Sequence, residues 1–268
     1  MRRNTSWFGN MIAGLAVVAM MTSAASASVI IYQDTFARTG VLHGDQLGVD
    51  AGFTGTGTLG GSTTAAWTAN AGEGHSSPNG ITLDGTVAAR VYNDHAFLPF
   101  TPQSGYVYTY SLDIDMAGGQ WGGFGFSKNN NVNNNLQNGG PADLGNSVVG
   151  WMLQRADGAS GNDALFTGPN YGAPDVDIGR GTTGWNTLSL ELDTTAAQWT
   201  VQFYRGDTAT GSSVNVASDA IDYLFVGALQ TNSQFDNLSL TAIPEPASGL
   251  MLLGATLGLG LLRRKLHG

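Results

Sequence analysis

Two pairs of carboxylates are the first candidates for chemistry in this 268-residue sequence. Asp113 and Asp115, and again Glu191 and Asp193, stand two residues apart, so each pair falls on one face of a strand. Hydrolysis of a glycosidic bond needs two carboxyl groups about 5–9 Å apart, one of them with a raised pKa. Neither pair belongs to an E-x-D-x-x-E run, and both fit polar strand faces that point to solvent. The sequence has no G-x-S-x-G motif either, so we predict that the protein is not an enzyme.

Two tryptophans break the alternation between inward and outward residues in their predicted strands. Trp121 shares its parity with Gly123, and Trp185 shares its parity with Thr187. Exposed aromatic rings on a sheet are suited to stacking against sugars, so both are candidate glycan-binding residues, and Tyr204 is a third. The alternative is that a loop covers each tryptophan at the start of its strand.

Asp34 and Asp236 are the candidate metal ligands. They lie in the first and last predicted strands, which often pair in jelly rolls, and a calcium ion between them could also take backbone carbonyl oxygens. The alternative is two solvated carboxylates at sheet edges. The chain has no cysteine, which excludes thiol catalysis and thiolate metal sites.

The charge of the body is strongly negative. Residues 28–242 hold 6 Lys or Arg against 19 Asp or Glu, a net charge of −13. Such acidity argues against binding to nucleic acid or to anionic lipid surfaces. Divalent cations are its natural counter-ions, which is why a structural calcium ion is the one cofactor that we consider.

The elements that must position these residues are strands. Short runs of β-branched and aromatic residues alternate with Gly, Asn and Pro clusters, and helical periodicity is confined to the two ends of the chain. The pattern predicts a single antiparallel jelly-roll β-sandwich over residues 28–242. The predicted strands are Val29–Phe36, Ala65–Asn70, Thr86–Tyr92, Tyr106–Met116, Gln120–Ser127, Ser147–Arg155, Asp163–Thr167, Thr187–Asp193, Gln198–Tyr204, Ile221–Val226 and Phe235–Thr241.

The first 27 residues have the organisation of a secretory signal peptide. Arg2 and Arg3 precede the apolar run Met11–Met21, and the small residues Ala25 and Ala27 follow it at cleavage-site spacing. The apolar run is too short to span a bilayer by itself. We therefore expect export, with cleavage after Ala27.

The last 26 residues, 243–268, combine a proline-flanked acid, an apolar run and a basic end. Pro244, Glu245 and Pro246 precede an uncharged run that would span roughly 24 Å as a helix. The basic end consists of Arg263, Arg264 and Lys265. This tail resembles the PEP-CTERM sorting signal of exported bacterial proteins. The resemblance implies an exosortase as partner, a transient membrane anchor before cleavage near the triplet, and a final place at the cell surface or outside the cell.

A second resemblance covers most of the body. Three parts of the sequence are similar to concanavalin/laminin-G-like sandwiches. They are Asp34-Thr-Phe-Ala-Arg38 together with Trp67 and Asn70, the segment Trp185-Asn-Thr-Leu-Ser-Leu-Glu-Leu-Asp193, and the ending Phe235-Asp-Asn-Leu-Ser-Leu240. Such families include lectins, carbohydrate-binding modules and glucanases, so the resemblance implies the fold and leaves the function open.

The function that these observations favour is that of a non-catalytic exported protein of the cell surface or extracellular matrix. The PEP-type tail implies a link to exopolysaccharide or biofilm. One alternative is a lectin-like module that binds polysaccharide, and the other is a glucanase-like hydrolase.

Overall fold

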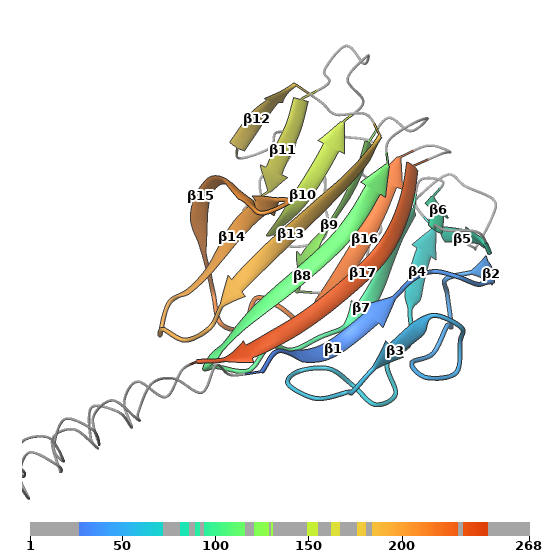
Figure 1. Cartoon of the computed structure of the whole chain (residues 1–268), viewed down its shortest axis with the longest axis horizontal. Coiled ribbons are helices and arrows are strands. Elements are labelled where there is room, and N and C mark those ends of the chain that lie inside the picture. Colours follow the sequence, from blue (N-terminus) through green and yellow to red (C-terminus); the bar gives the residue numbers. More distant parts are fainter. Residues whose placement is uncertain are drawn as a thin grey trace, which may run out of the picture. The chain divides into compact units, whose positions relative to one another are not determined.

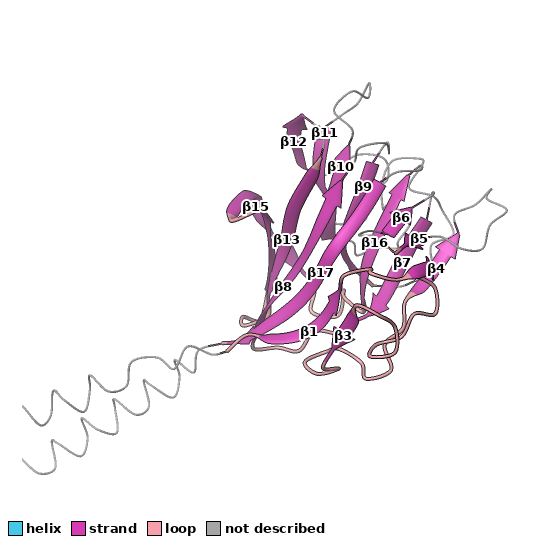
Figure 2. Cartoon of the chain, turned by 45° about the vertical axis from the view of Figure 1, so that its right-hand side comes forward, coloured by secondary structure: helices cyan, strands magenta, loops and turns pink. Residues whose placement is uncertain are grey.

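The protein is described by a computed structural model, which covers residues 27–71, 81–85, 89–91, 94–115, 121–128, 130, 149–154, 162–166, 176–180, 184–229 and 233–245. The chain divides into two units, Ser28–Ile243 and the terminal segments Met1–Ala27 with Pro244–Gly268. The described part of the first unit consists of strands and loops (Figure 2), which confirms the predicted all-β class. Within these ranges no helix has the length and hydropathy needed to span a membrane.

The strands form two antiparallel sheets. Sheet I contains β1 (Val29–Asp34), β2 (Thr39–Val41), β3 (Phe53–Gly55), β5 (Ile81–Asp84), β6 (Ala89–Val91), β8 (Tyr106–Asp115), β13 (Trp185–Asp193), β14 (Trp199–Arg205), β15 (Thr208–Val216) and β17 (Ser233–Pro244). Sheet II contains β4 (Thr68–Ala71), β7 (Asp94–Pro99), β9 (Trp121–Ser127), β10 (Val149–Gln154), β11 (Asn162–Phe166), β12 (Val176–Arg180) and β16 (Tyr223–Leu229).

The two sheets lie face to face (Figure 1). Sheet I follows the order β15-β14-β13-β8-β17-β6-β5-β2, and β1 pairs with both β17 and β3. Sheet II follows the order β12-β11-β10-β9-β16-β7-β4. Strands distant in sequence are therefore neighbours, as with β8 beside β13, or β9 beside β16.

Alternating sequence produces the buried face of sheet I. In β8 every second side chain from Tyr108 to Ile114 is fully buried, and the residues between them are partly exposed. The same period buries Leu188, Leu190 and Leu192 in β13, and Trp199, Val201 and Phe203 in β14. Burying one such side chain contributes roughly 1.5–3 kcal/mol, so a shift of register by one residue would forfeit that burial along a whole strand.

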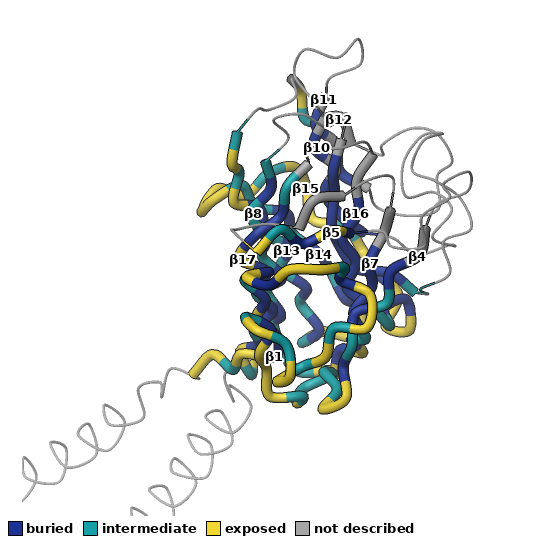
Figure 3. The backbone as a smooth tube through the Cα atoms, turned by 90° about the vertical axis from the view of Figure 1, so that its right-hand side faces the viewer, coloured by how far each residue is buried: buried dark blue, intermediate teal, exposed yellow. Residues whose placement is uncertain are grey.

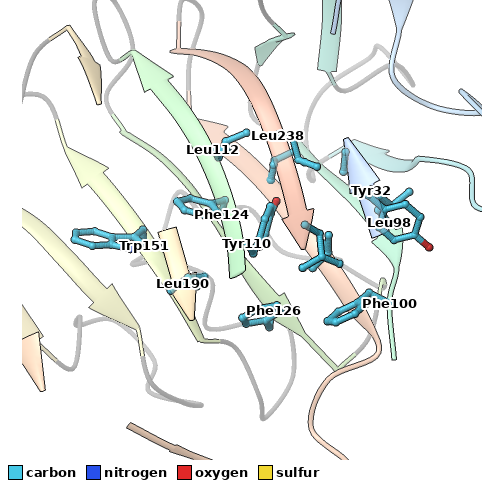
Figure 4. Close-up of a cluster of buried hydrophobic side chains, with 14 of the residues drawn as sticks. Tyr32, Leu98, Phe100, Tyr110, Leu112, Phe124, Phe126, Trp151, Leu190 and Leu238 are labelled. Atoms are coloured by element: carbon cyan, nitrogen blue, oxygen red, sulfur yellow. The ribbon is translucent and has the colours of Figure 1, made fainter. Parts of the chain in front are cut away.

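Aromatic side chains fill the space between the sheets, where most of the buried residues lie (Figures 3 and 4). Tyr110 from sheet I meets Phe124 from sheet II edge to face, with ring centroids 4.9 Å apart. Tyr110 also donates its hydroxyl hydrogen to the carbonyl oxygen of Phe225, 3.1 Å away. Trp151 and Phe203 make a second edge-to-face contact, at 5.8 Å. These contacts join the sheets into one core.

Several strands were not predicted, namely β2, β3, β5, β7, β12 and β15. The longest of them, β15, lies at the edge of sheet I and reads TATGSSVNV, with only Val216 buried. An edge strand that buries so little needs no apolar alternation, so the pattern that reveals β8 is missing here. The first strand ends earlier than predicted, at Asp34, because Phe36 adopts a left-handed conformation with φ of 50°.

Candidate functional site

The outer side of sheet I presents a continuous polar surface. β13 lies between β8 and β14, and the register places Thr187 opposite Asp113, and Ser189 opposite Tyr204. Residues of the same parity along these strands face away from the core. We call this surface the polar face. On the three strands it consists of Val107, Thr109, Ser111, Asp113, Asp115, Trp185, Thr187, Ser189, Glu191, Asp193, Thr200, Gln202 and Tyr204.

Trp185 is the large apolar side chain of the polar face. It begins β13 and is 48 % exposed, whereas Trp67, Trp151 and Trp199 are buried in the core. The burial of Trp199 follows from its parity with Val201 and Phe203 in β14. The exposure of Trp185 agrees with the stacking alternative and not with a ring covered by a loop. Sugar binding by this ring stays a prediction.

Tyr204 lies on the polar face with Trp185. It stands opposite Ser189, four residues along β13 from Trp185, on the adjacent strand. With about 3.3 Å per residue and about 4.8 Å between strands, the two aromatic residues are roughly 14 Å apart. The pKa of Tyr204 is raised, first by desolvation and then by the charge and hydrogen bond of Glu191. The two rings are thus spaced to contact one extended ligand at two points.

Three carboxylates of the polar face, Asp113, Glu191 and Asp193, have neutral hydrogen-bond partners. Asp113 accepts hydrogen bonds from the Thr187 hydroxyl at 2.6 Å and from the Asn237 amide at 2.9 Å. Asp193 accepts two hydrogen bonds from Thr195. Within the described part of the chain, the ion pairs do not involve Asp113, Glu191 or Asp193. Neutral donors leave the negative charge in place, so this face is acidic.

Arg205 is the one basic residue between positions 184 and 243, and it does not offset this charge. Its guanidinium donates to Asp163 at 2.7 Å and to Asn186 at 2.9 Å, and lies 5.6 Å from the centre of the Trp151 ring. Asp163 and Trp151 belong to sheet II and are buried. Arg205 therefore points between the sheets.

The two predicted tryptophan platforms belong to strands of different sheets. Trp121 begins β9, where it pairs with Gln154 and Leu229 in sheet II. Trp185 belongs to sheet I. The side chain of Trp121 lies outside what the structure describes, so its role stays a prediction, and the structure brings together only Trp185 and Tyr204.

Asp34 is fully buried, and both of its carboxylate oxygens accept hydrogen bonds from nitrogen donors. Arg38 donates to both of its oxygens, at 2.7 and 2.9 Å, and also to Asp45 at 2.5 Å. The indole of Trp67 donates to Asp34 at 2.9 Å, and the backbone N–H of Phe36 does so at 2.8 Å. Burial alone would lower the pKa of Arg38, but the hydrogen bonds and charges of Asp34 and Asp45 raise it.

This arrangement does not fit a calcium ion held by Asp34. A cation there would have to displace the guanidinium of Arg38, or share the carboxylate with it in a buried place where like charges repel strongly. In the sheet, Asp34 pairs with Leu238 and not with Asp236, which lies two residues earlier in β17. The described residues contain no group of three or more acidic or histidine side chains that could hold a metal ion. We therefore assign Asp34 a structural role.

Asp236 is the other predicted metal ligand and is only 8 % exposed. One of its oxygens accepts the backbone N–H of Asn237 at 2.7 Å. Desolvation raises the pKa of Asp236 most, the hydrogen bond lowers it, and the charges of Asp113 and Asp34 raise it further. Asn237 has a left-handed backbone with φ of 51°, so β17 is locally irregular next to the buried Asp236.

Sequence reasoning missed the partners of Asp34. Arg38 and Trp67 appeared only as parts of the sandwich-like pattern, and Asp45 was not singled out. One signal in the sequence could have revealed these partners. Arg38 is one of only six basic residues in the body, and it lies close to aromatic residues in the sequence. A cation in an apolar setting needs carboxylates nearby.

The predicted sorting and cleavage residues lie at the margins of the structure. Pro244 ends β17, and Glu245 follows it, exposed. Pro246, the basic end at Arg263, Arg264 and Lys265, and Ala25 lie outside the described residues. Ala27 is exposed just before β1. The signal peptide and the sorting tail stay predictions.

No family model matches the sequence, and no curated protein matches it significantly. Solved structures resemble it at low identity. The endo-1,3-β-glucanase from Streptomyces sioyaensis is 13 % identical, with a TM-score of 0.43, over 83 % of this chain and 99 % of that one. Domain 4 of the extracellular arabinanase AbnA from Geobacillus stearothermophilus is 16 % identical, with a TM-score of 0.42, over 82 % and 94 %. Peanut lectin is 10 % identical, with a TM-score of 0.40, over 66 % and 97 %. Similarity at this level assigns neither substrate nor activity to this chain.

Proposed function

We propose that this protein is exported and acts without catalysis at the cell surface or in the extracellular matrix, where its sandwich binds polysaccharide through the polar face. The observation that carries the binding proposal is the 48 % exposure of Trp185 among polar side chains. An indole ring has an apolar face that water solvates poorly, and the C–H face of a sugar covers it favourably. Tyr204 offers a second ring on the same side of the sheet.

Binding is tested by retention on affinity gels that contain different polysaccharides. We expect wild-type protein to be retained on at least one gel and Trp185→Ala to be retained much less. Val49→Ala is a matched control, because Val49 is 75 % exposed and lies in the loop between β2 and β3. Both variants should melt like wild type, since exposed substitutions usually change stability by less than about 0.5 kcal/mol. Passage of wild-type protein through every gel would contradict the proposal.

The proposed location is supported by the two ends of the sequence. Residues 1–27 have the composition of a signal peptide, and residues 243–268 have that of a PEP-type sorting tail, which implies an exosortase and a transient membrane anchor. The body between them would be a concanavalin-like jelly roll. The intact mass of the exported form tests both ends. We expect loss of residues 1–27 and of the tail beyond the Pro244–Pro246 region, and a full-length mass would contradict it.

A second candidate function is that of a glucanase-like hydrolase. Asp113 with Asp115, and Glu191 with Asp193, share the polar face, and the Cα atoms of each pair are about 6.6 Å apart along the strand. Carboxyl groups carried at this backbone spacing can reach the separation of about 5–9 Å that two-carboxylate hydrolysis requires. The test is release of reducing ends from common β-glucans. Release by wild-type protein that disappears in Asp113→Asn or Glu191→Gln would favour hydrolysis over binding.

A further inference from the structure

The negative charge of the polar face favours some classes of polysaccharide as ligands over others. The strands β8, β13, β14, β15 and β17 contain one basic residue, Arg205, and it points between the sheets toward Asp163. Asp113, Glu191 and Asp193 remain on the outside with neutral hydrogen-bond partners. A surface of this kind repels uronic acids and sulfated sugars, and it attracts cations.

Trp185 and the half-buried Tyr204 each have a carboxylate as a diagonal neighbour on the next strand. Asp113 stands opposite Thr187, two residues from Trp185. Glu191 stands two residues from Ser189, which faces Tyr204, and it shares a hydrogen bond with the Tyr204 hydroxyl. Diagonal neighbours are about 7–8 Å apart, a distance that a sugar ring and its amino substituent can bridge. The polar face thus repeats one motif, an aromatic ring beside a negative charge.

We infer that the polysaccharide bound by this face carries protonated amino groups, as in a polymer of N-deacetylated amino sugars, and this inference rests on the binding function proposed above. Each ring would stack on a sugar, while the neighbouring carboxylate pairs with the ammonium group of that sugar or the next. An ammonium group also interacts favourably with the face of an indole or phenol ring. A neutral glycan would gain the stacking but not the ion pair.

The test compares three tetrasaccharides with the same β-1,4 linkage on the exported protein by calorimetry, at a pH that keeps the amines protonated. They are the tetramers of glucosamine, of N-acetylglucosamine and of glucose. We expect the glucosamine tetramer to bind roughly three- to tenfold more tightly than the other two, which is the gain expected from two exposed ion pairs together, one beside each ring. This preference should shrink between about 0.01 M and about 0.15 M salt, because screening acts over about 8–10 Å at the higher concentration.

Matched variants test whether the preference for the glucosamine tetramer depends on the polar face. Asp113→Asn and Glu191→Gln should each reduce it, and Trp185→Ala should weaken binding of all three tetramers. Asp219→Asn is the control, because it removes the same charge from an exposed turn before β16. Tetralysine, which has charge but no sugar ring, should bind more weakly than the glucosamine tetramer, and its binding should depend less on Trp185 because it lacks the stacked sugar.

The outcomes separate this inference from the proposed function. Equal binding of the three tetramers, or preference for an anionic glycan such as a tetragalacturonate, would overturn the amino-sugar inference and leave polysaccharide binding intact. Failure of wild-type protein to bind any glycan would overturn both. An equal loss in Asp219→Asn and Asp113→Asn, or tetralysine binding as tight as that of the glucosamine tetramer, would show that net charge suffices and would overturn the inference.

Discussion

Replacing Arg38 with methionine would leave the carboxylate of Asp34 buried without a cation. Asp34 is 0 % exposed, and both of its oxygens accept hydrogen bonds from Arg38. Removing one partner of a buried ion pair costs about 3–5 kcal/mol. The N–H groups of Phe36 and Trp67 still donate to Asp34, which favours the lower part of this range.

The loss of the ion pair with Asp45 adds to this figure, but less than the loss at Asp34, because the Asp45 side chain is 16 % exposed. Methionine keeps an apolar side chain against Phe36 and Phe53, whose ring centres lie 6.0 and 5.9 Å from the guanidinium carbon. The lost cation–π contacts are worth about 0.5–1 kcal/mol. We therefore expect Arg38→Met to lose about 3–5 kcal/mol, a large part of the roughly 5–15 kcal/mol that stabilises a typical domain.

The assay is urea unfolding followed by tryptophan fluorescence, which reports on the network because Trp67 belongs to it. The double variant Asp34→Asn/Arg38→Met removes the fully buried charge and leaves only the partly exposed Asp45 without its cation, so it should be more stable than Arg38→Met alone.

Lys128→Met is the matched control. Lys128 and Asp222 form a 2.8 Å ion pair, but their side chains are 43 % and 36 % exposed. Solvent screens such a pair, so its loss should leave the unfolding midpoint nearly unchanged. The reasoning is refuted if Arg38→Met costs no more than Lys128→Met, or if the double variant is less stable than the single one.

Two further predictions follow from buried polar groups. Burial raises the pKa of Asp236, so ionisation of this carboxyl group opposes folding at pH values above that pKa. Asp236→Asn should therefore raise the melting temperature at pH 7. This gain should disappear as the pH falls toward the ordinary pKa range of an aspartic acid. A loss of stability in Asp236→Asn at pH 7 would mean that the charge is needed, for instance by a bound cation. Tyr110→Phe removes the hydroxyl that donates to the Phe225 carbonyl between the sheets and should cost about 1 kcal/mol in urea unfolding, whereas no loss would show that this hydrogen bond contributes nothing net.

The polar face could be derived from the sequence because it depends on a local property. A period of two along β8, β13 and β14 decides which side chains face the core, and the structure buries those side chains. The same parity rule singled out Trp185, which is exposed. The rule says nothing about strands such as β15 that bury little on either side, and these were missed.

The sequence by itself determined the all-β class, the alternation of the long strands and the acidity of the body, because each follows from neighbouring residues or from composition. Only the tertiary structure decided which of these residues meet. Strand pairing joins Asp113 to Thr187 across 74 residues, and loop packing brings Trp67 to Asp34 across 33. The tertiary structure also places Trp121 and Trp185 in different sheets. It pairs Asp34 with Arg38, where the sequence had predicted a metal ion. Such encounters depend on the order of strands in a sheet, which many non-local contacts settle together and which no single stretch of sequence encodes.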